Sequence, residues 1–187
     1  MKLNLPNKLT LARIAVLPVF VLVFYFPLFG FNNIILTVLY FFAGITDWFD
    51  GYLARRMELQ SEFGAFLDPV ADKLLVAVVL VLIASEQNNM LITISSVIII
   101  GREITISALR EWMANIGKKT HVAVSIIGKI KTSMQMLAIG FLLYEDPIGD
   151  FNVMLTGILL LAIAAALTLW SMMIYLRAAW PDLTKDQ

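Results

Sequence analysis

Six apolar stretches divide this chain of 187 residues, and they limit its fold more than any other feature. They lie near residues 14–29, 34–46, 74–84, 90–100, 134–144 and 153–176. The chain is 60% hydrophobic and 15% charged, with a mean hydropathy of +0.84. A water-soluble domain of this composition would have too few polar side chains to cover its surface. We therefore predict an integral membrane protein.

The lengths of these stretches predict polar residues inside the membrane spans. A helix needs roughly 20 residues to cross the ~30 Å hydrocarbon core, and four of the six stretches, with 11 to 13 residues each, are too short to do so alone. They reach spanning length only by including the polar motifs beside them. We predict one all-α membrane domain over residues 1–187, with six transmembrane helices around a polar cavity. Residues 1–11 predict a short interfacial helix, with an ordinary polar start before the first span as the alternative.

The distribution of Lys and Arg predicts the orientation of the spans. If the first residue lies in the cytoplasm, the outer connections fall near residues 30–33, 86–89 and 145–152, and none of them contains Lys or Arg. All 14 basic residues then lie in the cytoplasmic half of the spans or in the cytoplasmic loops. We predict that both termini and the polar cavity are on the cytoplasmic side. The absence of Cys is only weak evidence for a reducing compartment.

Four aspartates lie between the second and third apolar stretches: Asp47, Asp50, Asp68 and Asp72. On helices, positions 47 and 50 share a face, and positions 68 and 72 are one turn apart. Pro69 suits the first turn of a helix with Asp68 as its N-cap, and an earlier helix start would still bring both aspartates together. Carboxylates beside lipid need cations, and an all-oxygen set favours Mg²⁺ or Mn²⁺, with Ca²⁺ as an alternative. Two such ions together could bind a phosphate ester and activate the oxygen that attacks it.

Two other interpretations of the aspartates are weaker. In the first, they only extend to the membrane surface and pair with Arg55, Arg56 and Lys73. That role would not call for small residues such as Gly51 and Ala54 between the carboxylates. In the second, the protein is a cation transporter, for which acidic residues should mark a path across the membrane. The four aspartates instead gather at one end of their spans.

The segment from Asp47-Trp48-Phe49-Asp50-Gly51-Tyr52-Leu53-Ala54-Arg55 to Gly64-Ala65-Phe66-Leu67-Asp68-Pro69-Val70-Ala71-Asp72 resembles the signature of the CDP-alcohol phosphatidyltransferases. This resemblance implies a six-helix membrane enzyme, usually a homodimer, that displaces CMP from a CDP-linked substrate. It implies that Asp47, Asp50 and Asp68 bind metal, and that Asp72 completes the metal site and acts as the catalytic base. The residues implied to shape and hold the CDP group are Asp50, Gly51, Ala54, Arg55 and Gly64.

A group of basic residues in the fourth and fifth spans forms a second candidate site. Its members are Arg102, Arg110, Lys129 and Lys131. Cations within a membrane need an anionic partner. We predict that they bind the phosphate of the acceptor substrate, and the alternative is that they pair with Glu103 and Glu111.

Three further segments, residues 6–13, 102–112 and 128–132, resemble the bacterial members of the family that use sn-glycerol 3-phosphate as acceptor. The implied reaction joins CDP-diacylglycerol and sn-glycerol 3-phosphate to give phosphatidylglycerophosphate and CMP. The implied setting is the bacterial inner membrane, with membrane lipid and a second copy of the chain as partners and no nucleic acid. Inositol phosphate or serine remains an alternative acceptor. Thr10 and Arg13 are candidate nucleotide contacts, with a helix cap and an interface anchor as their alternatives.

Overall fold

The structure is a computed structural model that describes residues 5–26, 30–56, 62–115 and 126–183. Within these ranges, side chains are described except at positions 5–6, 47–56, 62–63, 65–66, 68, 126–129 and 181–183. The described backbone forms helices and, outside them, one isolated bridge between Ile148 and Phe151. The prediction of an all-α protein is confirmed.

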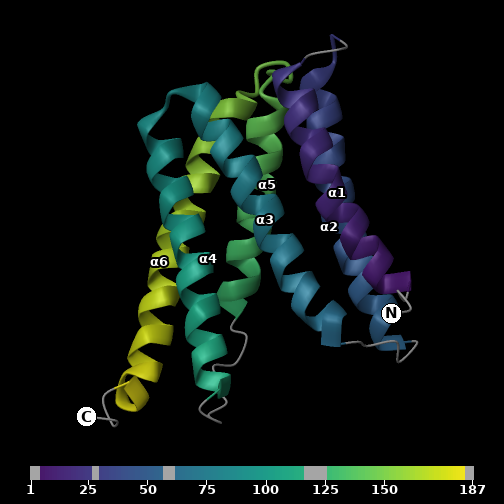
Figure 1. The fold of residues 1–187 in the computed structure, drawn as a ribbon. Coiled ribbons are helices and arrows are strands. Elements are labelled where there is room, and N and C mark those ends of the chain that lie inside the picture. The colour runs from purple at the N-terminus through teal and green to yellow at the C-terminus, as the bar shows by residue number, and fades with distance from the viewer. Residues whose placement is uncertain (1–4, 27–29, 57–61, 116–125, 184–187) are drawn as a thin grey trace.

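Six helices account for nearly all of the described residues (Figure 1). They are α1 (Leu5–Tyr25), α2 (Asn32–Arg56), α3 (Glu62–Gln87), α4 (Met90–Asn115), α5 (Ile126–Tyr144) and α6 (Val153–Leu183). Successive helices run in opposite directions, so the start of α1 and the end of α6 lie at the same end of the bundle (Figure 1). The end of α2 and the start of α3 lie at this end too, which we call the polar end.

Three of the helical segments are long and apolar enough to cross a membrane by length and composition: Asn7–Tyr25, Met90–Asn115 and Val153–Trp180. Two shorter apolar segments, Asn32–Thr46 and Ile130–Tyr144, lie in α2 and α5. These two helices continue beyond their apolar segments into the polar motifs, as the stretch lengths predicted. The total of six spans stays a prediction.

The segment expected as an interfacial helix is continuous with the first span. Helix α1 begins at Leu5, runs without a break to Tyr25 and contains Pro18 in its interior. Its polar residues Asn7, Thr10 and Arg13 follow a spacing of three and are all buried. Because three residues make slightly less than one helical turn, these side chains form one inward-facing stripe. The polar start of α1 therefore packs against the bundle and contributes to its interior.

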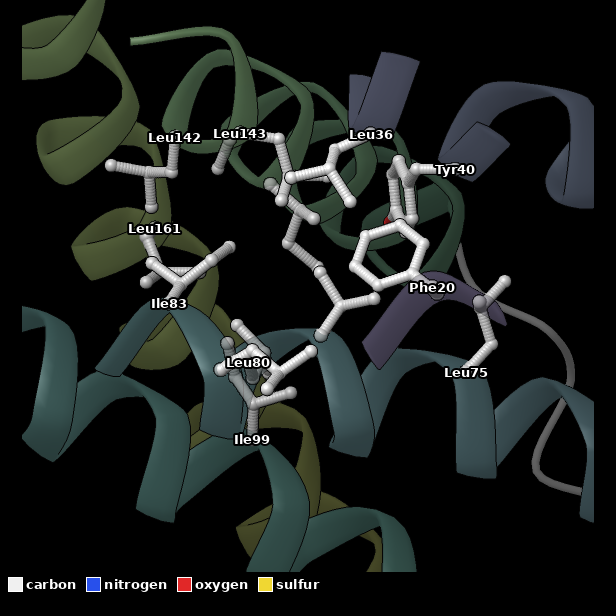
Figure 2. Packing of buried hydrophobic residues seen from close by; sticks show 14 of the residues in the cluster. Phe20, Leu36, Tyr40, Leu75, Leu80, Ile83, Ile99, Leu142, Leu143 and Leu161 are labelled. Atoms are coloured by element: carbon white, nitrogen blue, oxygen red, sulfur yellow. The ribbon is translucent and has the colours of Figure 1, made fainter. Parts of the chain in front are cut away.

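The hydrophobic core fills the half of the bundle away from the polar end. Side chains from all six helices meet there, and Figure 2 shows Phe20, Leu36, Tyr40, Leu75, Leu80, Ile83, Ile99, Leu142, Leu143 and Leu161. Phe20, Leu80, Ile99 and Leu161 have no exposed surface. The buried polar residues Thr10, Arg13, Lys131 and Gln135 lie on the other side of this core. The apolar half thus holds the helices together and leaves the polar end available for a site.

Candidate active site

The aspartate motif lies on the helix ends that meet at the polar end. Asp47 and Asp50 are in the last turns of α2, and Asp68 and Asp72 are in the first half of α3. Helix α3 begins at Glu62, so Asp68 is inside the helix and is not its N-cap. The helix already includes residues 62–67 before Asp68, and Pro69 lies in the helix interior. Helix α1 packs against both α2 and α3.

Among these aspartates, Asp72 is the one whose side chain is described. The side chains of Asp47, Asp50, Asp68, Gly51, Ala54 and Arg55 lie outside the described residues, although their backbone is helical. Gly64, the remaining residue expected to hold CDP, is buried in the first turn of α3. These positions therefore stay predictions, and the geometry of the site is built from Asp72 outward.

The carboxylate of Asp72 is paired with a buried arginine from α1. Arg13 Nη1 donates a hydrogen bond of 2.6 Å to Asp72 Oδ1. The Arg13 side chain is 2% exposed, whereas that of Asp72 is 47% exposed. A buried guanidinium needs a compensating anion, and a charge-assisted hydrogen bond fixes the orientation of that anion. Arg13 therefore holds one oxygen of Asp72 in place while the carboxylate stays accessible.

Asp72 lines a cavity of about 160 Å³ between four helices, which we call the Arg13 cavity. Its lining comprises Arg13, Tyr40, Ala43, Gly44, Asp72, Leu75, Val76, Thr132, Gln135 and Met136. On the α2 side the wall consists of Tyr40 and of the small residues Ala43 and Gly44. The cavity is apolar on most sides and polar near Asp72 and Gln135, a combination typical of ligand sites.

A second cavity of about 200 Å³ adjoins the first, and we call it the Lys131 cavity. Its lining comprises Asp72, Lys73, Val76, Glu103, Lys131, Thr132 and Gln135. Asp72, Val76, Thr132 and Gln135 line both cavities. Asp72 thus stands at the junction of two spaces, one apolar and one rich in charge.

The charged residues of the Lys131 cavity form a network that joins α3, α4 and α5. Glu103 Oε1 accepts hydrogen bonds from Arg102 Nη1 at 2.7 Å and from Lys131 Nζ at 3.3 Å. Lys73 Nζ donates to Ser107 Oγ. With Arg102 the group has three cations, and Asp72 and Glu103 are its two carboxylates, so 3 − 2 leaves an excess of one positive charge. Such an excess in a partly enclosed space favours an anionic ligand.

The buried state of this network strengthens that conclusion. The side chains of Lys131 and Arg102 are 6% and 11% exposed. Arg102 Nε is buried without a hydrogen-bond partner among the described residues. Desolvated cations cost free energy unless their donors are satisfied, and among the described side chains Glu103 is the anion that pairs with both residues. A further anion with several acceptor oxygens would satisfy the donors better.

Arg110 is not part of the lining of this cavity. Arg110 Nη2 donates to the hydroxyl of Tyr175 at 3.0 Å, and its guanidinium lies 5.2 Å from the centre of that ring. This pairing directs the exposed Arg110 side chain toward α6. Arg110 does not line either cavity. The side chain of Lys129 lies outside the described residues. Lys131 lines the cavity, and Arg102 joins it through Glu103.

Comparison with known proteins matches residues 3–174 to the model of the CDP-alcohol phosphatidyltransferase family. The chain belongs to that family. A relative from Yersinia pestis (strain Pestoides F), named CDP-diacylglycerol–glycerol-3-phosphate 3-phosphatidyltransferase, is 52% identical over 98% of both chains. Relatives with the same name from Yersinia enterocolitica and Salmonella paratyphi A are 52% and 50% identical, again over 98% of both chains. The family match therefore spans α1 to α5 and most of α6.

Several residues that line the two cavities were not predicted as site residues from the sequence. Lys73 and Glu103 were considered only as ion-pair partners, yet both line the Lys131 cavity. Gln135 and Thr132 were missed altogether. A signal for Gln135 does exist, because it follows Lys131 by four residues and so shares its helix face in an apolar span. Thr10, a predicted nucleotide contact, is fully buried and lines neither cavity.

Proposed function

We propose that this chain transfers the phosphatidyl group of CDP-diacylglycerol to sn-glycerol 3-phosphate and releases CMP. One observation carries the proposal: Asp72 stands where the Arg13 cavity meets the Lys131 cavity, whose charged network contains three cations. A donor in the first cavity and an anionic acceptor in the second would meet at this carboxylate. The shared name of relatives that are 50–52% identical supports the choice of these two substrates.

Asp72 acts as the general base in the proposed mechanism. Its carboxylate accepts the proton of the 1-hydroxyl group of glycerol 3-phosphate as that oxygen attacks the lipid-linked phosphorus. The new O–P bond forms while the bond from this phosphorus to the bridging diphosphate oxygen breaks, and the electron pair leaves with CMP. Arg13 keeps Asp72 oriented through its 2.6 Å hydrogen bond. Direct displacement requires no covalent enzyme intermediate.

The donor set of the aspartate motif fits a divalent cation. Asp47, Asp50, Asp68 and Asp72 would supply only carboxylate oxygens, the ligands that Mg²⁺ and Mn²⁺ prefer. A bound pair of such ions would neutralise the diphosphate and make CMP a better leaving group. Among the described side chains no cluster of three acidic residues or histidines occurs, and three of these aspartates lie outside that part of the chain. Chelation should abolish turnover, and Mg²⁺ or Mn²⁺ should restore it.

The phosphate of the acceptor is proposed to bind in the Lys131 cavity. Lys131 and Lys73 supply mobile ammonium donors, and Arg102 adds charge from α4. Glu103 orients Arg102 and Lys131 at a single oxygen, which keeps both donors near the cavity. The excess positive charge favours a phosphorylated acceptor over an uncharged one, although inositol phosphate would satisfy the same charges.

We place the protein in the bacterial inner membrane as a six-span homodimer with both termini and the site in the cytoplasm. The concentration of Lys and Arg at the polar end supports this orientation. The chain contains no cysteine, so a single introduced cysteine can be labelled without background. A cysteine at Lys8 should react with a membrane-impermeant thiol reagent only from the cytoplasmic side, and one at Asn88 only from the outside. The reverse pattern would overturn the orientation.

The experiment that tests the function uses the purified protein, CDP-diacylglycerol and one acceptor at a time. We expect CMP release with glycerol 3-phosphate and little or none with inositol phosphate or serine. In the same assay, Asp72→Asn should abolish CMP release while binding of CDP-lipid persists. Turnover that depends on inositol phosphate or serine instead would refute the proposed acceptor, and normal turnover by Asp72→Asn would refute the proposed base.

A further inference from the structure

Gln135 of α5 is a buried polar side chain that the proposed mechanism does not use. It is 7% exposed and lines both the Arg13 cavity and the Lys131 cavity. No hydrogen bond between described residues involves its amide group. A buried amide without a partner costs free energy, so a ligand that forms hydrogen bonds with it is favoured. Gln135 is therefore a candidate contact for a substrate in these cavities.

The position of Gln135 relates it to both of the charged groups proposed to act on the acceptor. It follows Lys131 by four residues, so the two side chains share a face of α5 and lie about 6 Å apart along the helix axis. Helix α5 starts toward the polar end, so Gln135 lies deeper in the bundle than Lys131 (Figure 1). Asp72 of α3 lines the same two cavities as Gln135. A cation, a carboxylate and a neutral amide thus border the space around the acceptor.

The three polar groups of glycerol 3-phosphate differ in the partners that they need. The phosphate is negatively charged and accepts hydrogen bonds, which suits Lys131 and the cations near it. The attacking 1-hydroxyl must lose a proton, which suits Asp72. The 2-hydroxyl stays neutral and both donates and accepts, and a glutamine amide offers a donor and an acceptor side by side. Gln135 therefore matches the 2-hydroxyl.

We propose that Gln135 binds the 2-hydroxyl of glycerol 3-phosphate and thereby sets the stereospecificity of the acceptor site. The inference rests on the proposed function, because it takes glycerol 3-phosphate as the acceptor. The 2-hydroxyl is attached to the chiral carbon, and the other two polar arms of that carbon carry the phosphate and the 1-hydroxyl. Three fixed contacts around one chiral carbon distinguish its two hands. With the contacts to Lys131 and Asp72 alone, either enantiomer would present a primary hydroxyl to the base.

The test compares three acceptors with the purified full-length protein and CDP-diacylglycerol. They are sn-glycerol 3-phosphate, its enantiomer sn-glycerol 1-phosphate, and 3-hydroxypropyl phosphate, which lacks the 2-hydroxyl. In the parent protein we expect kcat/KM for sn-glycerol 3-phosphate to exceed the other two values by about tenfold or more, because they leave a buried amide unpaired. Gln135→Met keeps the side-chain volume and should make the three values about equal. It should leave kcat/KM for 3-hydroxypropyl phosphate and the KM for CDP-diacylglycerol at their parent values.

The matched control makes the same substitution at the other end of the bundle. Gln87 of α3 lines neither cavity, and its amide donates to Glu145, so Gln87→Met should keep the preferences of the parent protein. A preference for sn-glycerol 3-phosphate that persists in Gln135→Met would overturn the inference. Loss of activity with all three acceptors would overturn it too, because Gln135 would then serve the fold or the donor. If the parent protein uses neither glycerol phosphate, the proposed function itself fails.

A second variant separates the phosphate contact from the hydroxyl contact. All three acceptors carry the phosphate, so Lys131→Met should lower their kcat/KM values by a similar factor and preserve the ratios between them. Gln135→Met should do the opposite and change the ratios. If Lys131→Met removed the stereochemical preference to the same extent, general misplacement of the acceptor would explain both variants, and the assignment of Gln135 would be wrong.

Discussion

The contact between Gly140 and Phe41 makes a sharp test of how α2 and α5 pack. A methyl group added at Gly140 would lie 2.5 Å from Cζ and 2.6 Å from Cε2 of the Phe41 ring. Carbon atoms pack favourably at about 3.5–4.0 Å, so Gly140→Ala requires the ring or the helix to move by about 1 Å. Both helices line the Arg13 cavity, and a shift between them would reach the candidate site.

The expected magnitude combines two opposing effects. Replacing a helical glycine by alanine gains about 1 kcal/mol of helix propensity. Overpacking a buried contact costs about 1–3 kcal/mol, and the upper half of that range applies because the clash involves two carbons of a rigid ring. Gly140→Ala should therefore lower the free energy of unfolding by about 1–2 kcal/mol. Gly101 in α4 has no atom within 4 Å of an added methyl group, so Gly101→Ala should raise it by up to about 1 kcal/mol.

The assay compares denaturant unfolding of both variants in detergent micelles, followed by the fluorescence of the four tryptophans. A double-mutant cycle with Phe41→Leu isolates the contact, because removal of the ring should remove most of the cost of Gly140→Ala. If Gly140→Ala proved as stable as Gly101→Ala, the close approach of α2 and α5 would be wrong. An unchanged cost in the Phe41→Leu background would place the strain somewhere other than at this ring.

Three further predictions test the acceptor cavity, the outer turn and a helix cap. Lys131→Met should raise the KM for glycerol 3-phosphate about tenfold or more, because a hydrogen bond to a charged group is lost, whereas the exposed Lys8→Met should not change it. Burial, together with nearby acidic side chains, raises the pKa of Glu145 above its ordinary value of 4.5. The free energy of unfolding should therefore fall as the pH rises from 4.5 through the raised pKa, and Glu145→Gln should flatten this dependence in unfolding measured across pH. Asn89 Oδ1 accepts hydrogen bonds from the amides of Leu91 and Ile92 at the start of α4, so Asn89→Ala should lower the free energy of unfolding by about 1 kcal/mol, and no change would refute the cap.

The α3–α4 and α5–α6 turns show how local signals and tertiary contacts combine. Asn88 and Glu145 adopt positive φ angles of 40° and 59°, and the side chain of Gln87 donates a hydrogen bond to Glu145. The polar composition of both turns was visible in the sequence, and it predicted connections near residues 86–89 and 145–152. Their contact with each other was not predictable, since 58 residues separate its two partners.

Local chemistry in the sequence determined the membrane class, the helical fold and the aspartate motif. Hydropathy, the limited length of apolar stretches and the spacing of residues on a helix are properties of short segments, and they remain the same in any packing arrangement. These properties also explain why Lys131 was recognised as an unusual cation in a span. The resemblance to the phosphatidyltransferases rested on one such segment, which the family match over residues 3–174 confirmed.

The tertiary structure decided which polar groups meet. It paired Arg13 with Asp72 across 59 residues, brought Glu103 to Lys131, and turned Arg110 toward Tyr175. Helices that are apolar around most of their circumference carry little information about which face meets which neighbour, because lipid and protein interior are equally favourable surroundings for them. Close packing and the need to compensate buried charge make that choice. For this reason the aspartate motif could be recognised in the sequence, and only the packed bundle placed Asp72 between two cavities.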